Sequence, residues 1–191
     1  MPAIPSRRAL GPPWSEEVIL ADGRALHIRP IRADDAEPLR HGFSLLEPEE
    51  IRLRFMHPMR ELTPELARRL SAIDARSDFA LIACEPSTHA QPSPPIVAVV
   101  RASIQADRRR AEYAIIVAHP FAGLGLGRHL MRRVIRWAQY RRLDEIFGDV
   151  LDENTAMLAL ADSLGFRRDR APGEPGVIRV RLPLKRASTT R

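Results

Sequence analysis

The chain has 191 residues, a length that suits one globular domain. Hydrophobic residues make up 45% and charged residues 28%, which excludes an intrinsically disordered chain. Lys and Arg number 30 against 24 Asp and Glu, so the net charge is +6, and every basic residue except Lys185 is arginine. This balance favours an anionic ligand. Nucleic acid is not the expected partner, because the arginines are dispersed and only 5% of the residues are aromatic.

The apolar runs and the cysteine content exclude two further classes. The longest apolar runs, such as residues 96–100, hold about five residues, whereas a bilayer span needs about twenty, so no membrane partner is expected. Cys84 is the single cysteine, so it cannot form an internal disulfide, and no residue beside it has the spacing of a metal ligand. These features predict a cytoplasmic protein that holds no metal.

The N-terminal third predicts a hairpin and two helices. Asp22-Gly23 tolerates the positive φ of a tight turn, which indicates a β-hairpin over residues 18–31. Asp34 and Glu37 have the spacing of a capping box and predict the start of a helix. Thr63 is followed by a proline, a pair that is typical of another helix start.

The rest of the chain alternates apolar strands with amphipathic segments. Strands are predicted at residues 79–84, 96–104, 112–118, 145–151 and 177–182, and helices at residues 125–142 and 157–164. No internal repeat or linker divides the chain. We therefore expect one α/β (α+β) domain over residues 17–184, between a flexible proline-rich arm at residues 1–16 and a flexible tail at residues 185–191.

Three alternating glycines, Gly123, Gly125 and Gly127, lie between a predicted strand and a predicted helix. Glycines let a backbone come close to a ligand, and a helix start supplies free N–H groups and positive dipole, so this loop predicts a phosphate or pyrophosphate site. A tight turn without a ligand is the alternative. The loop does not end in Gly-Lys-Ser/Thr, which excludes a P-loop. Its position late in the chain argues against a dinucleotide-binding fold.

Two blocks resemble motifs of the GNAT N-acetyltransferase superfamily. Residues 117–131, VAHPFAGLGLGRHLM, are similar to the acetyl-CoA loop of that family, and residues 153–166, ENTAMLALADSLGF, are similar to its later helix. Residues 28–35, 52–55 and 61–74 resemble the GNAT domain of bacterial protein lysine acetyltransferases. The similarity covers about residues 19–183. It implies a single GNAT fold, with a central mixed, mostly antiparallel sheet flanked by helices.

The resemblance implies that acetyl-CoA binds as a co-substrate. The residues expected to bind it are the backbone of Ile115, Ile116 and Val117, the loop residues Ala122, Gly123, Leu124, Gly125, Leu126 and Gly127, and the side chains of Arg128 and Asn154. Solvated helix surface is the alternative for Arg128, and a residue in the first turn of a helix is the alternative for Asn154. Ala122 stands where the family has Gln or Arg, so CoA binding should be weakened. Ala161 stands where many members have the tyrosine that protonates the leaving thiolate.

The reaction that the resemblance implies is transfer of the acetyl group to an amine, by direct attack in a ternary complex. Glu112, at the head of the strand before the loop, is the candidate general base, and a surface salt bridge with Arg109 or Arg110 is its alternative role. A protein lysine is the expected acceptor, with an acyl-CoA synthetase as one candidate partner. A small amine or amino acid is the alternative acceptor. An acyl-CoA-binding module without catalysis is the alternative function.

The segment at residues 43–63, with charges of both signs, is the expected docking surface. The resemblance places Arg54 and Phe55 at the wall of the acceptor side, although a core or helix-surface role is open.

Overall fold

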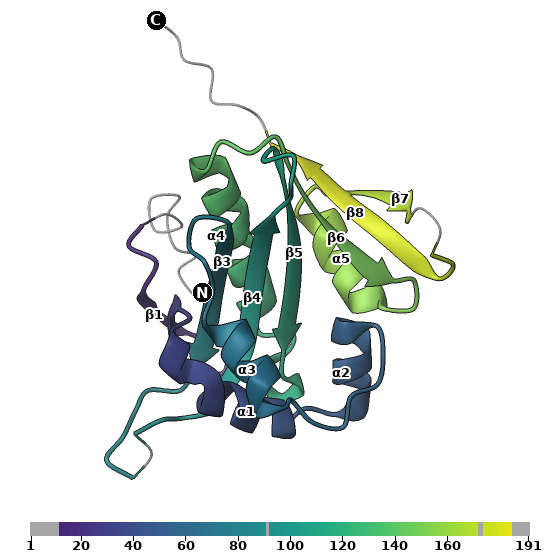
Figure 1. Ribbon diagram of the computed structural model, residues 1–191. Helices are drawn as coiled ribbons and strands as arrows, with labels where there is room; N and C mark the ends of the chain where they lie inside the picture. Colours follow the sequence, from purple (N-terminus) through teal and green to yellow (C-terminus); the bar gives the residue numbers. More distant parts are fainter. Residues whose placement is uncertain (1–11, 91, 172–173, 185–191) are drawn as a thin grey trace, which may run out of the picture.

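The computed structural model describes residues 12–90, 92–171 and 174–184, and these residues form one eight-stranded sheet with helices on both faces (Figure 1). The strands are β1 (Glu16–Ile19), β2 (Ala25–Pro30), β3 (Asp78–Cys84), β4 (Ile96–Ile104), β5 (Arg110–Val117), β6 (Glu145–Leu151), β7 (Arg167–Arg170) and β8 (Val177–Pro183). The helices are η2 (Ala33–Asp35), α1 (Ala36–Ser44), α2 (Pro48–Phe55), α3 (Pro64–Ser71), η3 (His119–Phe121), α4 (Leu126–Tyr140) and α5 (Thr155–Ser163).

The strand order in the sheet is β1-β2-β3-β4-β5-β6-β8-β7. All neighbouring strands are antiparallel except β5 and β6, which run parallel. Parallel neighbours need a crossover, and α4 provides it between these two strands. The prediction of a mixed, mostly antiparallel sheet flanked by helices is confirmed.

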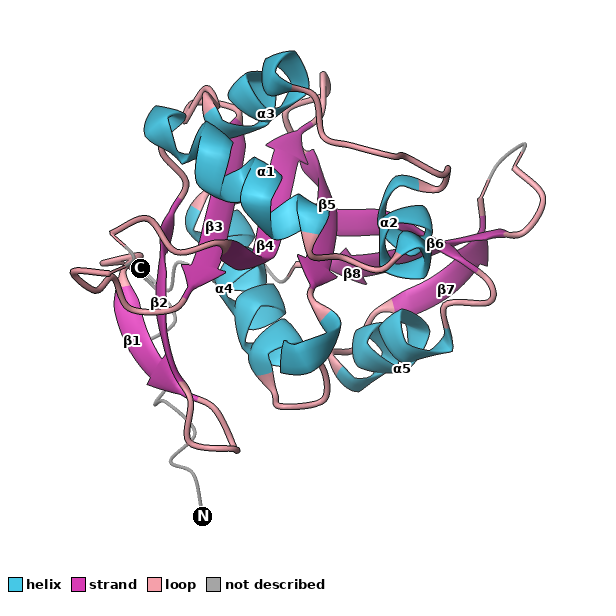
Figure 2. Ribbon diagram, turned by 90° about the horizontal axis from the view of Figure 1, so that it is seen from below, coloured by secondary structure: helices cyan, strands magenta, loops and turns pink. Residues whose placement is uncertain are grey.

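Helices α1, α2 and α3 cover one face of the sheet, and α4 and α5 cover the other (Figures 1 and 2). The main core lies between the sheet and α4, where the residues of the predicted apolar stripe are fully or almost fully buried: Leu126, Leu130, Val134 and Ala138. Arg128 and Arg136, on the opposite side of α4, are exposed as the periodicity predicts. Within the described residues, no helix has the length and hydropathy to cross a bilayer.

The predicted capping box of Asp34 and Glu37 is wrong, because the box lies two residues earlier, at Arg32 and Asp35. Asp35, not Asp34, accepts a hydrogen bond from the N–H of Arg32 at 2.7 Å and forms a two-bonded ion pair with Arg29 of β2. These contacts hold Asp35 against the sheet, so the chain makes the short helix η2 before α1 begins. Glu37 instead pairs with Arg40 within α1.

Two elements, α2 and β7, were not predicted from the hydrophobic pattern. The sequence of α2, PEEIRLRF, buries only Ile51 fully, so it carries no apolar stripe that would reveal a helix. The edge strand β7 consists of four exposed charged residues and shows no alternation. Charged side chains at a sheet edge discourage pairing with another chain.

The ordered domain begins earlier than the predicted boundary at residue 17. Trp14 packs edge-on against Phe79, with ring centroids 4.9 Å apart, and Glu16 is the first residue of β1. Glu16 also accepts a hydrogen bond from the buried Arg133 of α4 at 2.5 Å. Residues 1–11 of the predicted arm and the predicted tail, residues 185–191, lie outside the described residues.

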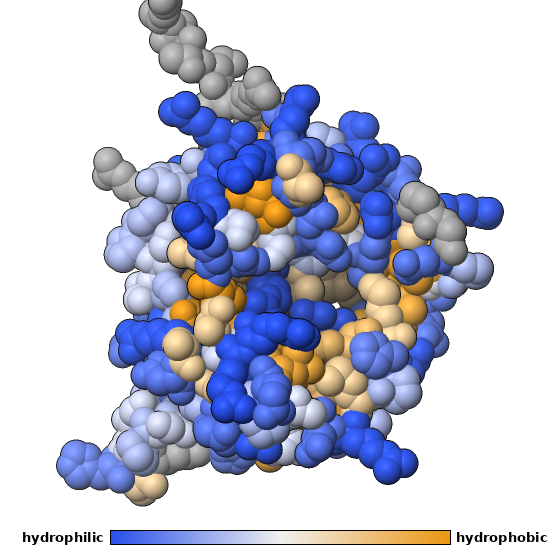
Figure 3. All heavy atoms as spheres, viewed as in Figure 1, coloured by the Kyte–Doolittle hydropathy of each residue, from blue (hydrophilic) through white to orange (hydrophobic). Residues whose placement is uncertain are grey.

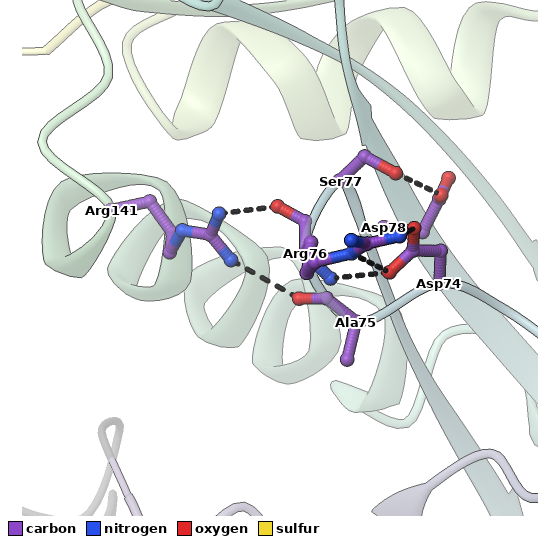
Figure 4. Close-up of polar contacts among 6 residues, drawn as sticks. All are labelled: Asp74, Ala75, Arg76, Ser77, Asp78 and Arg141. Carbon is purple, nitrogen blue, oxygen red and sulfur yellow. Dashed lines mark hydrogen bonds and ion pairs between the residues drawn. The ribbon is translucent and has the colours of Figure 1, made fainter.

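Arg141 anchors the end of α4 to the loop that precedes β3 (Figure 4). Its guanidinium donates hydrogen bonds to the carbonyl of Ala75, at 3.2 Å, and to the carbonyl of Arg76. The loop itself is braced by the ion pair of Arg76 with Asp74. Since α4 is fixed at this end and packed along the sheet, its first turn is held at the far end of β5, beside the glycine loop.

Candidate active site

Strands β5 and β6 pair only at their first residues and then separate. The ladder joins Arg110 to Glu145, Ala111 to Ile146 and Glu112 to Phe147. Beyond Glu112, β5 continues to Val117 and pairs with β4 along its other edge. In the described part of the chain, no strand covers the second edge of residues 113–117, so some of the backbone N–H and C=O groups of the predicted residues Ile115, Ile116 and Val117 face a gap. Figure 3 shows the surface hollowed near the centre of the α2 face, where Figure 1 shows this gap.

Tyr113 and Gly148 meet where the two strands begin to separate. A Cβ atom on Gly148 would lie 2.8 Å from the Tyr113 ring, so only glycine lets the ring rest on the β6 backbone. Phe166 packs edge-on against the same ring, with centroids 5.5 Å apart. The ring is buried on the α5 side of the sheet, as alternation with Glu112 predicts, and burial raises the pKa of Tyr113.

The glycine loop follows β5 directly and becomes the first turn of α4. Gly123 and Gly125 have φ values of +74° and +89°, a left-handed region that favours glycine, and both are exposed. The first helical hydrogen bond runs from the N–H of His129 to the carbonyl of Gly125 at 3.0 Å. The N–H groups of residues 126–128 have no acceptor among the described residues. They form a set of free donors at the positive end of a helix, which suits a phosphate group.

Side chains around the loop are arranged so that its backbone faces outward. Leu126 is buried in the core and Leu124 packs against it, so both can offer a ligand only their backbone groups. A Cβ atom on Gly127 would lie 3.5 Å from Leu160 of α5 and 3.8 Å from Val117 of β5. The start of α4 therefore sits between the end of β5 and α5, at the open end of the gap.

Arg24, in the turn between β1 and β2, supports the loop from outside and was not singled out from the sequence. Its guanidinium stacks on the ring of Phe121, 4.1 Å from the centroid, and donates a hydrogen bond to the carbonyl of Pro120. These residues belong to η3, the turn that leads into the glycines. No sequence signal marks this contact, because 96 positions separate Arg24 from Pro120.

Glu112 is exposed and lies on the opposite face of β5 from Tyr113. The two arginines proposed as its surface partners are engaged elsewhere: Arg109 pairs with Asp144 and Arg110 pairs with Asp107, both at 2.6 Å. In the described part of the chain, the Glu112 carboxylate has no ion-pair partner within 4 Å. The charge of Glu112 favours the charged forms of Arg54 of α2 and Arg179 of β8, but it forms an ion pair with neither. The geometry thus leaves Glu112 available to take up a proton.

The strand, the glycine loop and α5 all fall within a region that matches a known domain. The profile of the acetyltransferase (GNAT) domain matches residues 25–167, about three quarters of the chain. The chain belongs to the GNAT family. A curated relative, Acetyltransferase PA5475 of Pseudomonas aeruginosa, is 30% identical over 174 residues, which are 91% of this chain and 91% of the relative. The protein is accordingly a GNAT-type N-acetyltransferase, in a family whose acetyl donor is acetyl-CoA.

Solved GNAT structures have the same fold. The GNAT domain of S. lividans PAT superposes with a TM-score of 0.78 at 26% identity, over 90% of this chain and 97% of that one. The spermidine N-acetyltransferase of Vibrio cholerae, solved in complex with CoA and spermine, gives a TM-score of 0.64 at 18% identity, over 83% of this chain and 95% of that one. The second similarity shows a shared fold only.

Three positions of this GNAT domain carry less than the family pattern would offer. Asn154 is the N-cap of α5, where its side-chain oxygen accepts a hydrogen bond from the N–H of Met157 at 3.1 Å, so part of its hydrogen-bonding capacity is used within the helix. Ala122 is exposed at the loop and has no polar side chain. Ala161 is fully buried and, being an alanine, has no hydroxyl that could protonate a thiolate. Arg128 is exposed beside the free N–H groups.

A cavity of about 50 Å³ lies on the α1–α3 side of the sheet, next to Arg54. Most of its walls are apolar side chains, and the chief ones are Leu39, Phe43, Leu46, Phe55, Leu62 and Ile116. Arg54 of α2 and Arg101 of β4 are its charged residues. Burial, helped by repulsion from Arg101, lowers the pKa of Arg54 to about 10, and the charge of Glu112 opposes this shift. Arg54 and Phe55 both line this cavity, and their role at the wall of the acceptor side stays a prediction.

Proposed function

We propose that this GNAT enzyme transfers the acetyl group of acetyl-CoA to a primary amine with Glu112 as general base, and that its favoured acceptor is a lysine side chain of a protein. One observation carries the proposal. The exposed Glu112 carboxylate, the free edge of β5 and the free N–H groups of the glycine loop follow one another along a single strand and the turn after it.

The arrangement suits a ligand with an anionic head and an extended polar arm. The pyrophosphate of acetyl-CoA would bind the N–H groups at the start of α4, with Arg128 beside them. The pantetheine arm, which carries amide groups, would hydrogen-bond to Ile115, Ile116 and Val117 as an added strand does. The arm would then run from Val117 toward Glu112, where the thioester is needed.

A general base such as Glu112 is needed because the acceptor amine must lose a proton. A free lysine amine has a pKa near 10.4, so presenting it neutral at pH 7 costs about 4.6 kcal/mol. In the proposed step, the amine nitrogen forms a bond to the thioester carbonyl carbon, one amine proton passes to the Glu112 carboxylate, and the C–S bond breaks. CoA leaves as the thiolate and takes up a proton. A positioned base contributes about 10²- to 10⁴-fold to such a reaction.

The likeness to the GNAT domain of S. lividans PAT and the surface near the cavity favour a protein acceptor. Helix α2 presents Glu49 and Arg52 at the surface, charges of both signs that suit a folded partner, such as an acyl-CoA synthetase. A small amine or amino acid is the second candidate acceptor, favoured by the mostly apolar cavity beside Arg54.

Binding and turnover of acetyl-CoA test the proposal in two stages. Acetyl-CoA at about 100 times its dissociation constant should stabilise the fold by about 2.7 kcal/mol, measured as a rise in melting temperature. Release of free CoA thiol should then depend on an added lysine peptide or acyl-CoA synthetase. A melting temperature that does not respond to acetyl-CoA would overturn the donor assignment. Turnover of spermidine or free amino acids at rates equal to the protein acceptor would move the assignment to small amines.

A further inference from the structure

Two arginines from different elements line the cavity. Arg54 comes from α2, above the sheet, and Arg101 comes from β4, in the sheet itself. Arg54 stacks over the Phe55 ring, 4.8 Å from its centroid, and Arg101 donates a hydrogen bond to the carbonyl of Leu70 at 3.2 Å. Among the described residues, neither arginine has a carboxylate within 4 Å. By contrast, Arg52 on the same helix and Arg40 on α1 are both ion-paired.

The acidic groups that face this pair lie too far away to neutralise it. Glu112 stabilises the charge of Arg54, and Asp78 stabilises the charge of Arg101, but neither forms an ion pair with it. Asp78 is already hydrogen-bonded to the hydroxyls of Ser77 and Ser103. Burial lowers the pKa of Arg101 as it does that of Arg54. Two positive charges therefore share a partly desolvated, mostly apolar space.

Such an arrangement is unfavourable in the absence of an anion. A charge removed from water needs a counter-charge or hydrogen bonds, and two like charges that face one cavity repel each other. A carboxylate is the natural counterpart, because it can accept hydrogen bonds from two guanidinium groups at once. The cavity lies on the same sheet face as Glu112, and Arg54 links the two, since it lines the cavity and interacts with that carboxylate.

We propose that the acceptor carries a carboxylate as well as its amine, and that this carboxylate binds between Arg54 and Arg101 while the amine lies at Glu112. The proposal rests on the acetyl-transfer function argued above. The apolar walls, which include Phe43 and Leu46, suit the methylene groups that separate the two ends of such an acceptor. The carboxylate can belong to a free amino acid or to an acidic residue beside an acceptor lysine. A polyamine, which brings only positive charge, is disfavoured by the same two arginines.

Matched acceptors test the proposal without altering the protein. Free lysine is compared with lysinamide, and a peptide with Glu beside its lysine is compared with the same peptide carrying Gln, using release of CoA thiol as the measurement. We expect kcat/KM to favour the carboxylate member of at least one pair about 10- to 100-fold. A preference for free lysine over lysinamide would identify an amino acid as the source of the carboxylate. A preference for the Glu peptide over the Gln peptide would identify an acidic protein segment instead. Equal rates within both pairs, or faster acetylation of spermidine, would overturn the proposal.

Variants then assign the preference to the two arginines. In Arg54→Gln and Arg101→Gln, the ratio of kcat/KM between carboxylate and carboxamide acceptors should fall to near one. Arg68→Gln removes an exposed, ion-paired arginine of α3 outside the cavity and should keep the wild-type ratio. The rise in melting temperature with acetyl-CoA shows whether each variant is folded. An unchanged ratio in both cavity variants would contradict the assignment.

Binding of a simple anion separates this proposal from the acetyl-transfer function. Pentanoate should raise the melting temperature of the wild-type protein, pentanamide should not, and the effect of pentanoate should be lost in Arg101→Gln. If no acceptor is acetylated but pentanoate binds in this way, the acetyl-transfer proposal fails and the carboxylate site stands. If acceptors are acetylated and pentanoate has no effect, the carboxylate site fails.

Discussion

Arg52 of α2 and Glu153, in the loop between β6 and α5, form an ion pair with a nitrogen–oxygen distance of 2.5 Å, although 101 positions separate them in the chain. Helix α2 lies against β5, whereas Glu153 follows β6. The pair therefore connects the two sides of the gap between these strands. Arg52 also binds Glu49 within α2, at 2.7 Å, and both carboxylates favour its charged form.

Glu153→Gln should loosen α2 without unfolding the protein. Both side chains of the pair are exposed, so its loss should leave the free energy of unfolding almost unchanged. Because α2 carries Arg54, we expect the KM of the acceptor to rise about two- to fivefold. Glu49→Gln, which removes the partner of Arg52 inside α2, is the control. Steady-state kinetics should show a larger rise in KM for Glu153→Gln, and equal values would mean that the connection across the gap does not position α2.

The glycine loop and its flanking elements could be predicted because their signals are local. The apolar stripe of α4, the strand before it and the three glycines are all contained within residues 112–142. An amphipathic helix buries its apolar face whichever element it packs against, so its hydrophobic periodicity predicts the helix without knowledge of that element. Gly123 and Gly125 have left-handed φ values, which glycine adopts readily whatever lies around it, so this feature of the loop also follows from the local sequence.

The acceptor side could not be predicted in this way, because contacts between distant segments create it. Arg101 is the one charged residue of β4 and becomes a candidate binding residue only when α2 brings Arg54 to the same cavity. Helix α2 itself has little apolar surface, so its position depends on contacts such as the pair of Arg52 with Glu153. The contact of Arg24 with η3 could not be predicted from the sequence for the same reason.

Gly125→Ala should separate the conformational role of the loop from its role in binding. Alanine at a φ of +89° costs about 1–2 kcal/mol of stability, although the space around Gly125 is open. The added methyl group also projects from the loop backbone where the phosphate would approach, so acetyl-CoA should no longer raise the melting temperature. Gly165→Ala is the control, because it has a φ of +87° and only ordinary contact with Leu182. It should lose similar stability and keep the acetyl-CoA effect. Loss of that effect in both variants would indicate general unfolding rather than a phosphate site.

Gly148→Ala should destabilise the point where β5 and β6 separate. The new methyl group would lie 2.8 Å from the Tyr113 ring, and Phe166 packs against that ring, so it has little room to move. Overpacking of this kind typically costs about 1–3 kcal/mol, which urea denaturation would measure. Gly127→Ala is the matched control, since its Cβ atom meets only ordinary contacts and it lies within α4. There, alanine should leave stability unchanged or raise it by up to about 1 kcal/mol. Equal stability of the two variants would show that the Tyr113 ring can shift away from β6.

Glu112→Gln should remove the proposed base and leave the donor site intact. Glutamine has nearly the same shape but cannot accept the amine proton, so kcat/KM should fall about 10²- to 10⁴-fold, a loss of about 2.7–5.4 kcal/mol in transition-state stabilisation. The affinity for acetyl-CoA, measured by calorimetry, should change little, because the glycine loop and the free edge of β5 do not involve this side chain. Glu17→Gln, which alters an exposed glutamate on β1, is the control and should retain full activity. A loss of less than fivefold in Glu112→Gln would assign proton removal to water or to a group that the acceptor itself brings.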